Sequence, residues 1–141
     1  MKKVVLDTSV LTSGLRSRFG ASYVVLRRVQ TGHVLPLVTT ALFLEYEAVL
    51  TRQEHLTASG FTAREMVAFL DAFAGFCYPV EVHFSWRPQL RDANDEMVLE
   101  AAVNGRADAL VTFNTVHFTA AAARFHLPIW LPQRLLQEIR L

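Results

Sequence analysis

The sequence predicts an α/β fold in three layers (α/β/α) around a central parallel sheet of about five strands. Two observations support this prediction. Short apolar runs that suit buried strands alternate with segments of helical periodicity along the chain. The connections are short, so helical crossovers make the strands parallel and place helices on both faces of the sheet. The 141 residues contain no repeat, and we expect one domain over residues 1–141.

The composition limits the class of protein. With 52% hydrophobic and 19% charged residues, the chain has the content of a globular protein with a substantial core. A net charge of +1 gives no overall field for a nucleic acid, so such binding depends on local patches. Cys77 lies among apolar neighbours and is predicted to be a structural thiol. No apolar run reaches membrane-spanning length, and the run before Asp7 is too short for a signal peptide, so we expect a cytoplasmic protein without a membrane partner.

The five predicted strands are short runs rich in apolar residues. They lie at 4–6, 34–38, 80–84, 109–113 and 129–131. Pro36 should place the second strand at an edge or a bulge, because proline donates no hydrogen bond to the ladder. In the third, apolar residues alternate with Glu81 and His83, which predicts one polar face.

The predicted helices are placed by their caps. Residues 10–20 suggest a helix start that runs into a loop. Ser22 is expected to cap the second helix, and Thr39 or Thr40 the third, which should reach about residue 53.

The later helices have clearer starts. Thr62 and Glu65 form a capping box, and Asp92 opens the next helix. Thr119 is expected to cap a short alanine-rich helix, and Pro132 suits the first position of the last one.

Asp7 follows the first strand directly, at the sheet edge where ligands of open α/β proteins bind. The alternative is that Asp7 and Ser9 only cap the next turn. Glu45 and Glu47 point about 200° apart on a helix, so only one of them can face the sheet. Glu45 shares a face with Leu42 and is therefore the expected inward acid.

Asp95 shares a helix face with Val98 and Leu99, so an apolar stripe begins with a carboxylate that needs a partner. Asp92 lies about one turn earlier, where helix capping and a direct role in the site are both open.

These acids predict a metal site. Two carboxylates about 4 Å apart repel by roughly 4 kcal/mol at an effective dielectric near 20. Asp7, Glu45 and Asp95 therefore cannot remain ionised together without protons or a cation. Hard oxygen ligands without a Cys or His cluster suit Mg²⁺ or Mn²⁺ rather than Zn²⁺.

Four motifs now stand in order along the chain: Leu6-Asp7-Thr8-Ser9-Val10, the Glu45 helix after Thr39-Thr40, Asp92-Ala93-Asn94-Asp95-Glu96, and Val111-Thr112-Phe113-Asn114. On these motifs the whole chain resembles the PIN-domain family. Within it, the chain resembles the small VapC-type toxin ribonucleases of bacterial toxin–antitoxin pairs. The resemblance implies a PIN-like fold and a Mg²⁺- or Mn²⁺-dependent endoribonuclease that hydrolyses RNA phosphodiester bonds.

The resemblance also implies roles for single residues. The first acid of the family falls on Asp7, the helix acid on Glu45 and the third acid on Asp95, which makes these the expected catalytic and metal-binding residues. Asp92 matches an acid often found just before the third, and Ser9 and Thr112 match hydroxyl positions that line the site and meet the substrate.

The chain departs from the family at the fourth acid. Asn114 stands there and offers a carbonyl oxygen without charge, so a second metal ion would be held less firmly. His117 precedes Phe118, where the family can have an acid. It is open whether His117 binds Mn²⁺, contacts an RNA phosphate or is an ordinary loop histidine.

The substrate contacts expected for RNA are arginines. Arg16 and Arg18, in the segment that leaves Asp7, are the first candidates for phosphate contacts, followed by Arg87 and Arg91. An ordinary surface role is equally open for them. Trp86 is expected either to stack on a base or to anchor its loop.

Two rival functions remain. A phosphatase of the haloacid-dehalogenase kind needs a second acid two residues after the first, where this chain has Ser9. A binding module that has lost catalysis would use its groove for RNA or for a protein. The resemblance implies a protein antitoxin and a homodimer, and the aromatic face that includes Phe69 and Phe76 is open to either core or interface packing.

Overall fold

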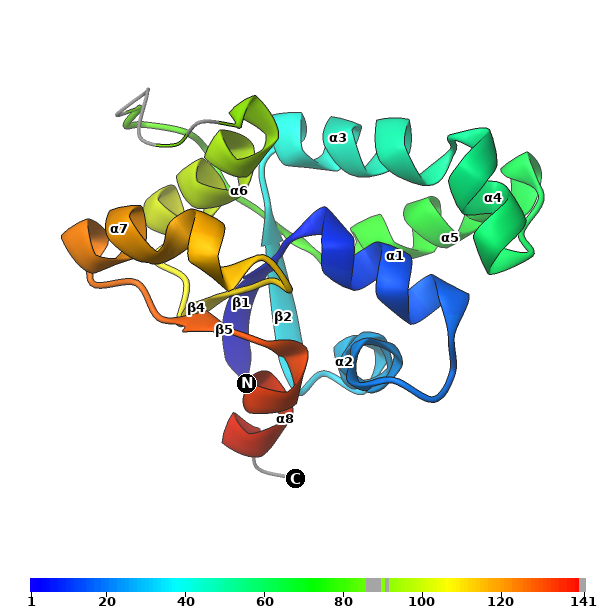
Figure 1. The fold of residues 1–141 in the computed structure, drawn as a ribbon, viewed down its shortest axis with the longest axis horizontal. Helices are drawn as coiled ribbons and strands as arrows, with labels where there is room; N and C mark the ends of the chain where they lie inside the picture. The colour runs from blue at the N-terminus through cyan, green and yellow to red at the C-terminus, as the bar shows by residue number, and fades with distance from the viewer. Residues whose placement is uncertain (86–89, 91, 140–141) are drawn as a thin grey trace.

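The computed structural model describes residues 1–85, 90 and 92–139. In this part of the chain, five parallel strands form one sheet in the order β3-β2-β1-β4-β5 (Figure 1). They are β1 (Lys2–Leu6), β2 (Val34–Val38), β3 (Tyr78–Pro79), β4 (Ala109–Val111) and β5 (Ile129–Trp130). The central strand is therefore the one that ends at Asp7. This confirms the predicted α/β fold with its parallel sheet.

Helices flank the sheet, with α1 and α2 on one side of the strands in Figure 1 and α7 on the other. In chain order they are α1 (Thr8–Arg16), α2 (Ala21–Gln30), α3 (Thr40–Leu50), α4 (Gln53–Ser59), α5 (Ala63–Phe76), α6 (Ala93–Asn104), α7 (Thr115–Phe125) and α8 (Pro132–Glu138).

Several predicted helix ends are confirmed. The Thr39 side chain accepts a hydrogen bond from the Leu42 N–H at the start of α3, and Thr62 and Glu65 form the capping box of α5. Pro132 occupies the first turn of α8. These ends are local devices, so the sequence alone is enough to locate them.

The third strand was predicted in the wrong place. β3 is Tyr78–Pro79, and after a last hydrogen bond from the Val80 N–H to the Val38 carbonyl, at 2.8 Å, the chain leaves the sheet. The N–H groups of His83 and Phe84 each donate to Oδ1 of Asn104, at 2.9 Å, so an α6 side chain satisfies the backbone that a neighbouring strand would have paired. Alternation along the chain could not reveal this tertiary contact.

The second strand has the predicted bounds, but it is not an edge strand, because it lies between β3 and β1. β3 pairs with β2 only at Leu37 and Val38, so Pro36 has a partner in β1 and none in β3. A proline without a strand neighbour on one side costs no ladder hydrogen bond on that side.

Other boundaries also differ. Ser22 and Thr119 lie inside α2 and α7 rather than at their caps, because α2 follows Gly20 and α7 follows Asn114. Serine and threonine are found within helices, where the hydroxyl can donate a hydrogen bond to a carbonyl one turn back. Thr119 donates to the Thr115 carbonyl in this way. The expected helix to residue 53 ends at Leu50, and the extended conformation of Arg52 separates it from α4.

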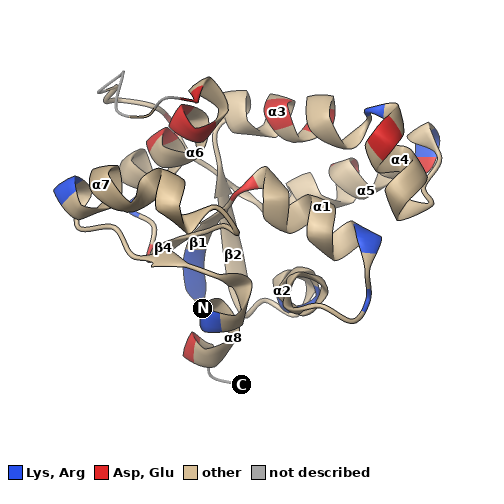
Figure 2. Ribbon diagram, in the orientation of Figure 1, with Lys and Arg blue, Asp and Glu red and all other residues tan. Residues whose placement is uncertain are grey.

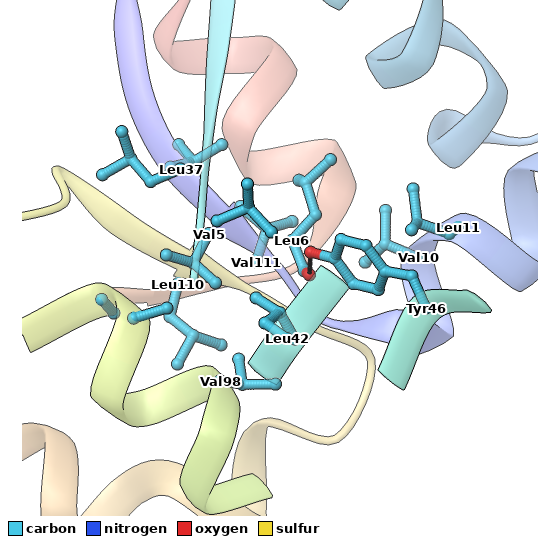
Figure 3. Close-up of a cluster of buried hydrophobic side chains, with 14 of the residues drawn as sticks. Val5, Leu6, Val10, Leu11, Leu37, Leu42, Tyr46, Val98, Leu110 and Val111 are labelled. Atoms are coloured by element: carbon cyan, nitrogen blue, oxygen red, sulfur yellow. Dashed lines mark hydrogen bonds between the residues drawn. The ribbon is translucent and has the colours of Figure 1, made fainter. Parts of the chain in front are cut away.

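The core forms where the strand ends meet α1, α3 and α6 (Figure 3). Val5, Leu6 and Val111 of the strands are fully buried, and Leu42 and Tyr46 of α3 pack on them. About 25 cal/mol for each Å² of buried apolar surface makes such packing the main stabilising term.

Tyr46 adds a polar link inside this core. Its hydroxyl donates a hydrogen bond to the backbone carbonyl of Leu6, one residue before Asp7 (Figure 3). Burial first, and then the charges of Cys77 and Asp7, raise the pKa of Tyr46 well above its ordinary value of 10.0. The hydroxyl therefore keeps its proton, and α3 is tied to the end of the central strand.

We predict that Tyr46→Phe lowers the free energy of unfolding by about 1–2 kcal/mol, because it leaves a buried carbonyl without this donor. Urea denaturation followed by circular dichroism measures the change. Tyr78→Phe is the matched control, since Tyr78 is 58% exposed and should change stability by less than about 0.5 kcal/mol. Equal stability of the two variants would contradict the assigned role of Tyr46.

Candidate functional site

Asp7 lies at the end of the central strand with 7% of its surface exposed. Its backbone N–H donates to the Val111 carbonyl at 2.9 Å, which fixes the residue against β4. Asp7 occupies the N-cap position of α1, but its side chain forms no capping hydrogen bond. The capping alternative for this carboxylate is therefore wrong.

Two hydroxyl groups hold the carboxylate instead. Oδ2 of Asp7 accepts from Oγ of Ser9 at 2.9 Å and from Oγ1 of Thr112 at 2.7 Å. The Ser9 hydroxyl accepts from the Phe113 N–H, and the Thr112 hydroxyl accepts from the Asn114 N–H. Each hydroxyl has a single proton and accepts from a backbone amide, so each is oriented to donate its own proton to Asp7.

The hydrogen bonds leave the two carboxylate oxygens of Asp7 in different environments. Oδ2 is occupied by two donors, whereas Oδ1 accepts none within the described part of the chain. Ser9 and Thr112, which were expected to line the site and meet the substrate, both contact Asp7 directly. The arrangement orients one carboxylate oxygen and leaves the other able to bind a ligand.

Asp95 supplies a second, partly buried carboxyl group. It lies in the first turn of α6, and 13% of its side chain is exposed. Burial is the main reason that its pKa rises above the ordinary value of 3.8, and the charges of Asp92 and Asp7 raise it further. His117 acts in the opposite direction, with its Nδ1 at 3.3 Å from Oδ2 of Asp95.

These carboxylates interact across different elements. Figure 2 shows acidic residues between β1 and α1, at the start of α6 and along α3. The sequence prediction that Asp7 and Asp95 approach one another is consistent with the effect of Asp7 on the pKa of Asp95.

Asp92 is the N-cap of α6. Its side chain is exposed and accepts a hydrogen bond from the Asn94 N–H at 2.8 Å. The capping interpretation therefore holds for Asp92, and its charge still acts on Asp95.

Glu45 lies on α3, which packs against both α1 and α6. Glu45 is half-buried and Glu47 is exposed, in agreement with their expected orientations. Glu45 is not among the groups that shift the pKa of Asp95. Within residues 1–85, 90 and 92–139, no three His, Cys, Asp or Glu side chains lie close enough together to hold a metal ion without rearrangement.

The chemistry of the donors nevertheless fits a hard divalent cation. Asp7 offers Oδ1, and Asp95 is a partly buried carboxylate whose charge is opposed by the like charges of Asp7 and Asp92. In the described part of the chain, no Lys or Arg forms an ion pair with any of these three acids. Carboxylate oxygens are the preferred ligands of Mg²⁺ and Mn²⁺.

Asn114 and His117 lie at the same edge. Asn114 is the exposed N-cap residue of α7, and its backbone N–H reaches the hydroxyl that holds Asp7. His117 follows in the first turn of α7 and contacts Asp95. The turn after β4 thus contributes to both acids.

The structure places the predicted phosphate-binding arginines away from the acids. Arg16 is in the last turn of α1, roughly 12 Å along the helix from its start. Its Nη2 lies 2.7 Å from Nδ1 of His55 on α4. The expectation that Arg16 lies in a loop is wrong, and Arg18 borders an apolar groove instead. Arg87, Arg91 and Trp86 lie outside the described residues.

That groove, of about 280 Å³, lies between α1, α2 and α5. The phenylalanines of the predicted aromatic face differ in how deeply they are buried. Phe73 is buried in the core, Phe61 and Phe69 are half-buried, and Phe76 is exposed. The aromatic face therefore serves the core and still leaves an apolar surface.

Sequence reasoning missed a polar row on α6. Glu96 is buried and accepts from the Leu90 N–H at 2.6 Å, Glu100 accepts from the Ser85 hydroxyl, and Asn104 binds Phe84. These side chains hold Phe84, Ser85 and Leu90 against α6. Their spacing of four residues was the available signal, because residues four apart share a helix face.

None of the helices in the described ranges is long and apolar enough to cross a membrane.

The comparison with protein families gives one result. A family model described as PIN domain matches residues 3–116. A search of curated proteins gave no match. The PIN domains are a family of nucleases, and they typically bind divalent metal ions. From this match, and in agreement with the five-stranded parallel sheet and the acids at its edge, the chain belongs to the PIN-domain family.

Proposed function

We propose that this protein is a metal-dependent endoribonuclease that hydrolyses RNA phosphodiester bonds as the toxin of a toxin–antitoxin pair. The observation that most supports a nuclease site is the orientation of Asp7. Two hydroxyl groups hold its Oδ2 while Oδ1 stays without a partner in the described part of the chain, and a second, partly buried acid, Asp95, is close enough to be affected by its charge.

In this proposal Asp7, Glu45 and Asp95 hold Mg²⁺ or Mn²⁺, with Asp92 and Asn114 as further oxygen ligands. When bound, such an ion activates a water molecule and neutralises charge on the phosphate group. The half-buried Glu45 side chain would have to turn toward the other two acids to complete this set. Such a change of rotamer is within the reach of a side chain that is not fully packed.

The remaining residues orient the acids and the substrate. Ser9 and Thr112 fix Asp7 and are themselves held by backbone amides of the β4–α7 turn, so that Asp7 is already oriented when the ligand arrives. Arg16 is proposed to contact an RNA phosphate group at a distance from the acids, since His55 uses only one of its five N–H donors. Arg18 is exposed and is offered with it.

A second candidate function is an RNA- or protein-binding module with little or no catalysis. Asn114 in place of an acid supports it, as does the separation of Glu45 from the other acids. Such a module would bind RNA with or without Mg²⁺ and would not cleave it.

The proposed toxin role implies two binding partners, a protein antitoxin and a second copy of this chain. The antitoxin partner is tested by the neighbouring gene. We expect a small gene immediately upstream that encodes a DNA-binding protein. Light scattering of the purified chain tests the homodimer.

We predict that Asp7→Asn and Asp95→Asn each reduce cleavage of single-stranded RNA in Mg²⁺ or Mn²⁺ by at least about 100-fold, since each removes a charged metal ligand. Gel analysis of labelled RNA measures the rates. Asp71→Asn, an equal change of charge on an exposed face of α5, is the control and should cleave normally. Cleavage at equal rates by all of these proteins would remove the proposed site, and metal-independent RNA binding without cleavage would favour the binding module.

Thr112→Val keeps the shape of a fully buried side chain but removes its hydrogen bond to Asp7. We expect metal affinity to fall by roughly 10–100-fold, as is typical when a residue that orients a ligand is lost. Calorimetric titration with Mn²⁺ measures it, and Thr119→Val on the exposed face of α7 is the control. Unchanged affinity would mean that the hydroxyl does not orient the metal ligand.

The raised pKa of Asp95 predicts how stability depends on pH without metal. A carboxyl whose pKa is higher in the folded state destabilises the fold once it ionises, so its stabilising contribution is lost as pH rises through that folded pKa. Asp95→Asn should therefore be more stable than the parent protein at pH 7 in EDTA. The difference should shrink as pH falls toward the ordinary carboxyl value of 3.8.

Urea denaturation at several pH values checks this prediction. Asp71→Asn should show no such pH-dependent gain. If Asp95→Asn were less stable at pH 7, Asp95 would be a structural residue.

A further inference from the structure

His117 is the one group of the described residues whose side chain forms an ion pair with an acid of the proposed metal site. Its Nδ1 lies 3.3 Å from Oδ2 of Asp95. The backbone N–H of His117 donates to the Asn114 carbonyl at 3.0 Å, and the Asn114 N–H binds the hydroxyl that holds Asp7. The β4–α7 turn therefore fixes both His117 and the Asp7 clamp.

The distance between these two atoms is that of neighbouring ligands on one ion. Ligands at about 2.1 Å from an octahedral metal ion are separated by roughly 3.0 Å along each edge of the octahedron. A nitrogen and a carboxylate oxygen at 3.3 Å can thus bind one ion after a shift of a few tenths of an ångström. The His117 side chain is 57% exposed, so nothing in its packing opposes that shift.

A simple ion pair would leave the charge of this region unbalanced. Asp7, Asp92 and Asp95 provide three carboxylates, and the described residues provide no Lys or Arg that pairs with them. One imidazolium could offset one of these charges. A divalent ion held by the imidazole and the carboxylates together would offset two and would use the nitrogen as a ligand.

We propose that Nδ1 of His117 is a metal ligand in the place of the absent fourth acid, and that the site therefore selects Mn²⁺ over Mg²⁺. This inference rests on the proposed metal-dependent function. Mg²⁺ prefers oxygen ligands and keeps its waters, whereas imidazole nitrogen binds transition-metal ions well. The loss of an acid at Asn114 and the added imidazole of His117 should both shift the metal preference toward Mn²⁺.

Electron spin-echo spectroscopy of the Mn²⁺-loaded protein tests the proposal directly, because a coordinated imidazole gives a ¹⁴N coupling to the metal. We expect this coupling in the parent protein and in His83→Gln, the control at an exposed histidine. It should be absent in His117→Gln and His117→Asp. Near-ultraviolet circular dichroism verifies that the variants remain folded.

Calorimetric titrations with Mn²⁺ and with Mg²⁺ supply a second measurement. The ratio of Mn²⁺ affinity to Mg²⁺ affinity should fall at least about tenfold in His117→Asp, which restores an oxygen ligand. Mn²⁺ binding without a ¹⁴N coupling, or an unchanged ratio in His117→Asp, would overturn this inference and leave the proposed nuclease intact. Failure of the parent protein to bind Mn²⁺ at all would overturn both.

Discussion

A buried carboxylate at the end of the central strand constrains much of this structure. Asp7 is nearly enclosed, and a carboxylate removed from water must be hydrogen-bonded or paired with a cation to be tolerated. The hydroxyls of Ser9 and Thr112 meet this need on one oxygen. Because Thr112 follows β4 directly, the same hydrogen bond also joins the ends of β1 and β4, so the site and the sheet are stabilised by one contact.

The apolar core and the polar edge are connected by α3. Tyr46 packs among the strand residues and donates its hydroxyl proton to the Leu6 carbonyl, which places Glu45 on the border of the acidic edge. On α6, three polar side chains hold residues that come before Asp92 in the sequence: Glu96 binds Leu90, Glu100 binds Ser85 and Asn104 binds Phe84. The acids therefore stand on rigid elements, as a site that must be preorganised requires.

The acidic edge lowers the stability of the folded protein when no cation is present. Burial, and then the charges of Asp92 and Asp7, raise the pKa of Asp95, which is a cost to the folded protein when no cation is present. A core of fully buried side chains beneath this edge offsets that cost. Perturbed carboxyl groups supported by a well-packed scaffold are typical of active sites.

The amino-acid sequence by itself determined the alternation of strands and helices, the main helix caps and the positions of Asp7 and Asp95 at one edge. Hydrophobic periodicity and caps are local signals, and parallel topology then brings the strand ends together. Only the tertiary structure decided the position of β3, the break before α4 and the partners of Ser9, Thr112, Arg16 and His117. The position of β3 and the partners of Thr112, Arg16 and His117 depend on contacts between distant residues, such as Asn104 with His83 or Arg16 with His55, whose geometry no local pattern encodes.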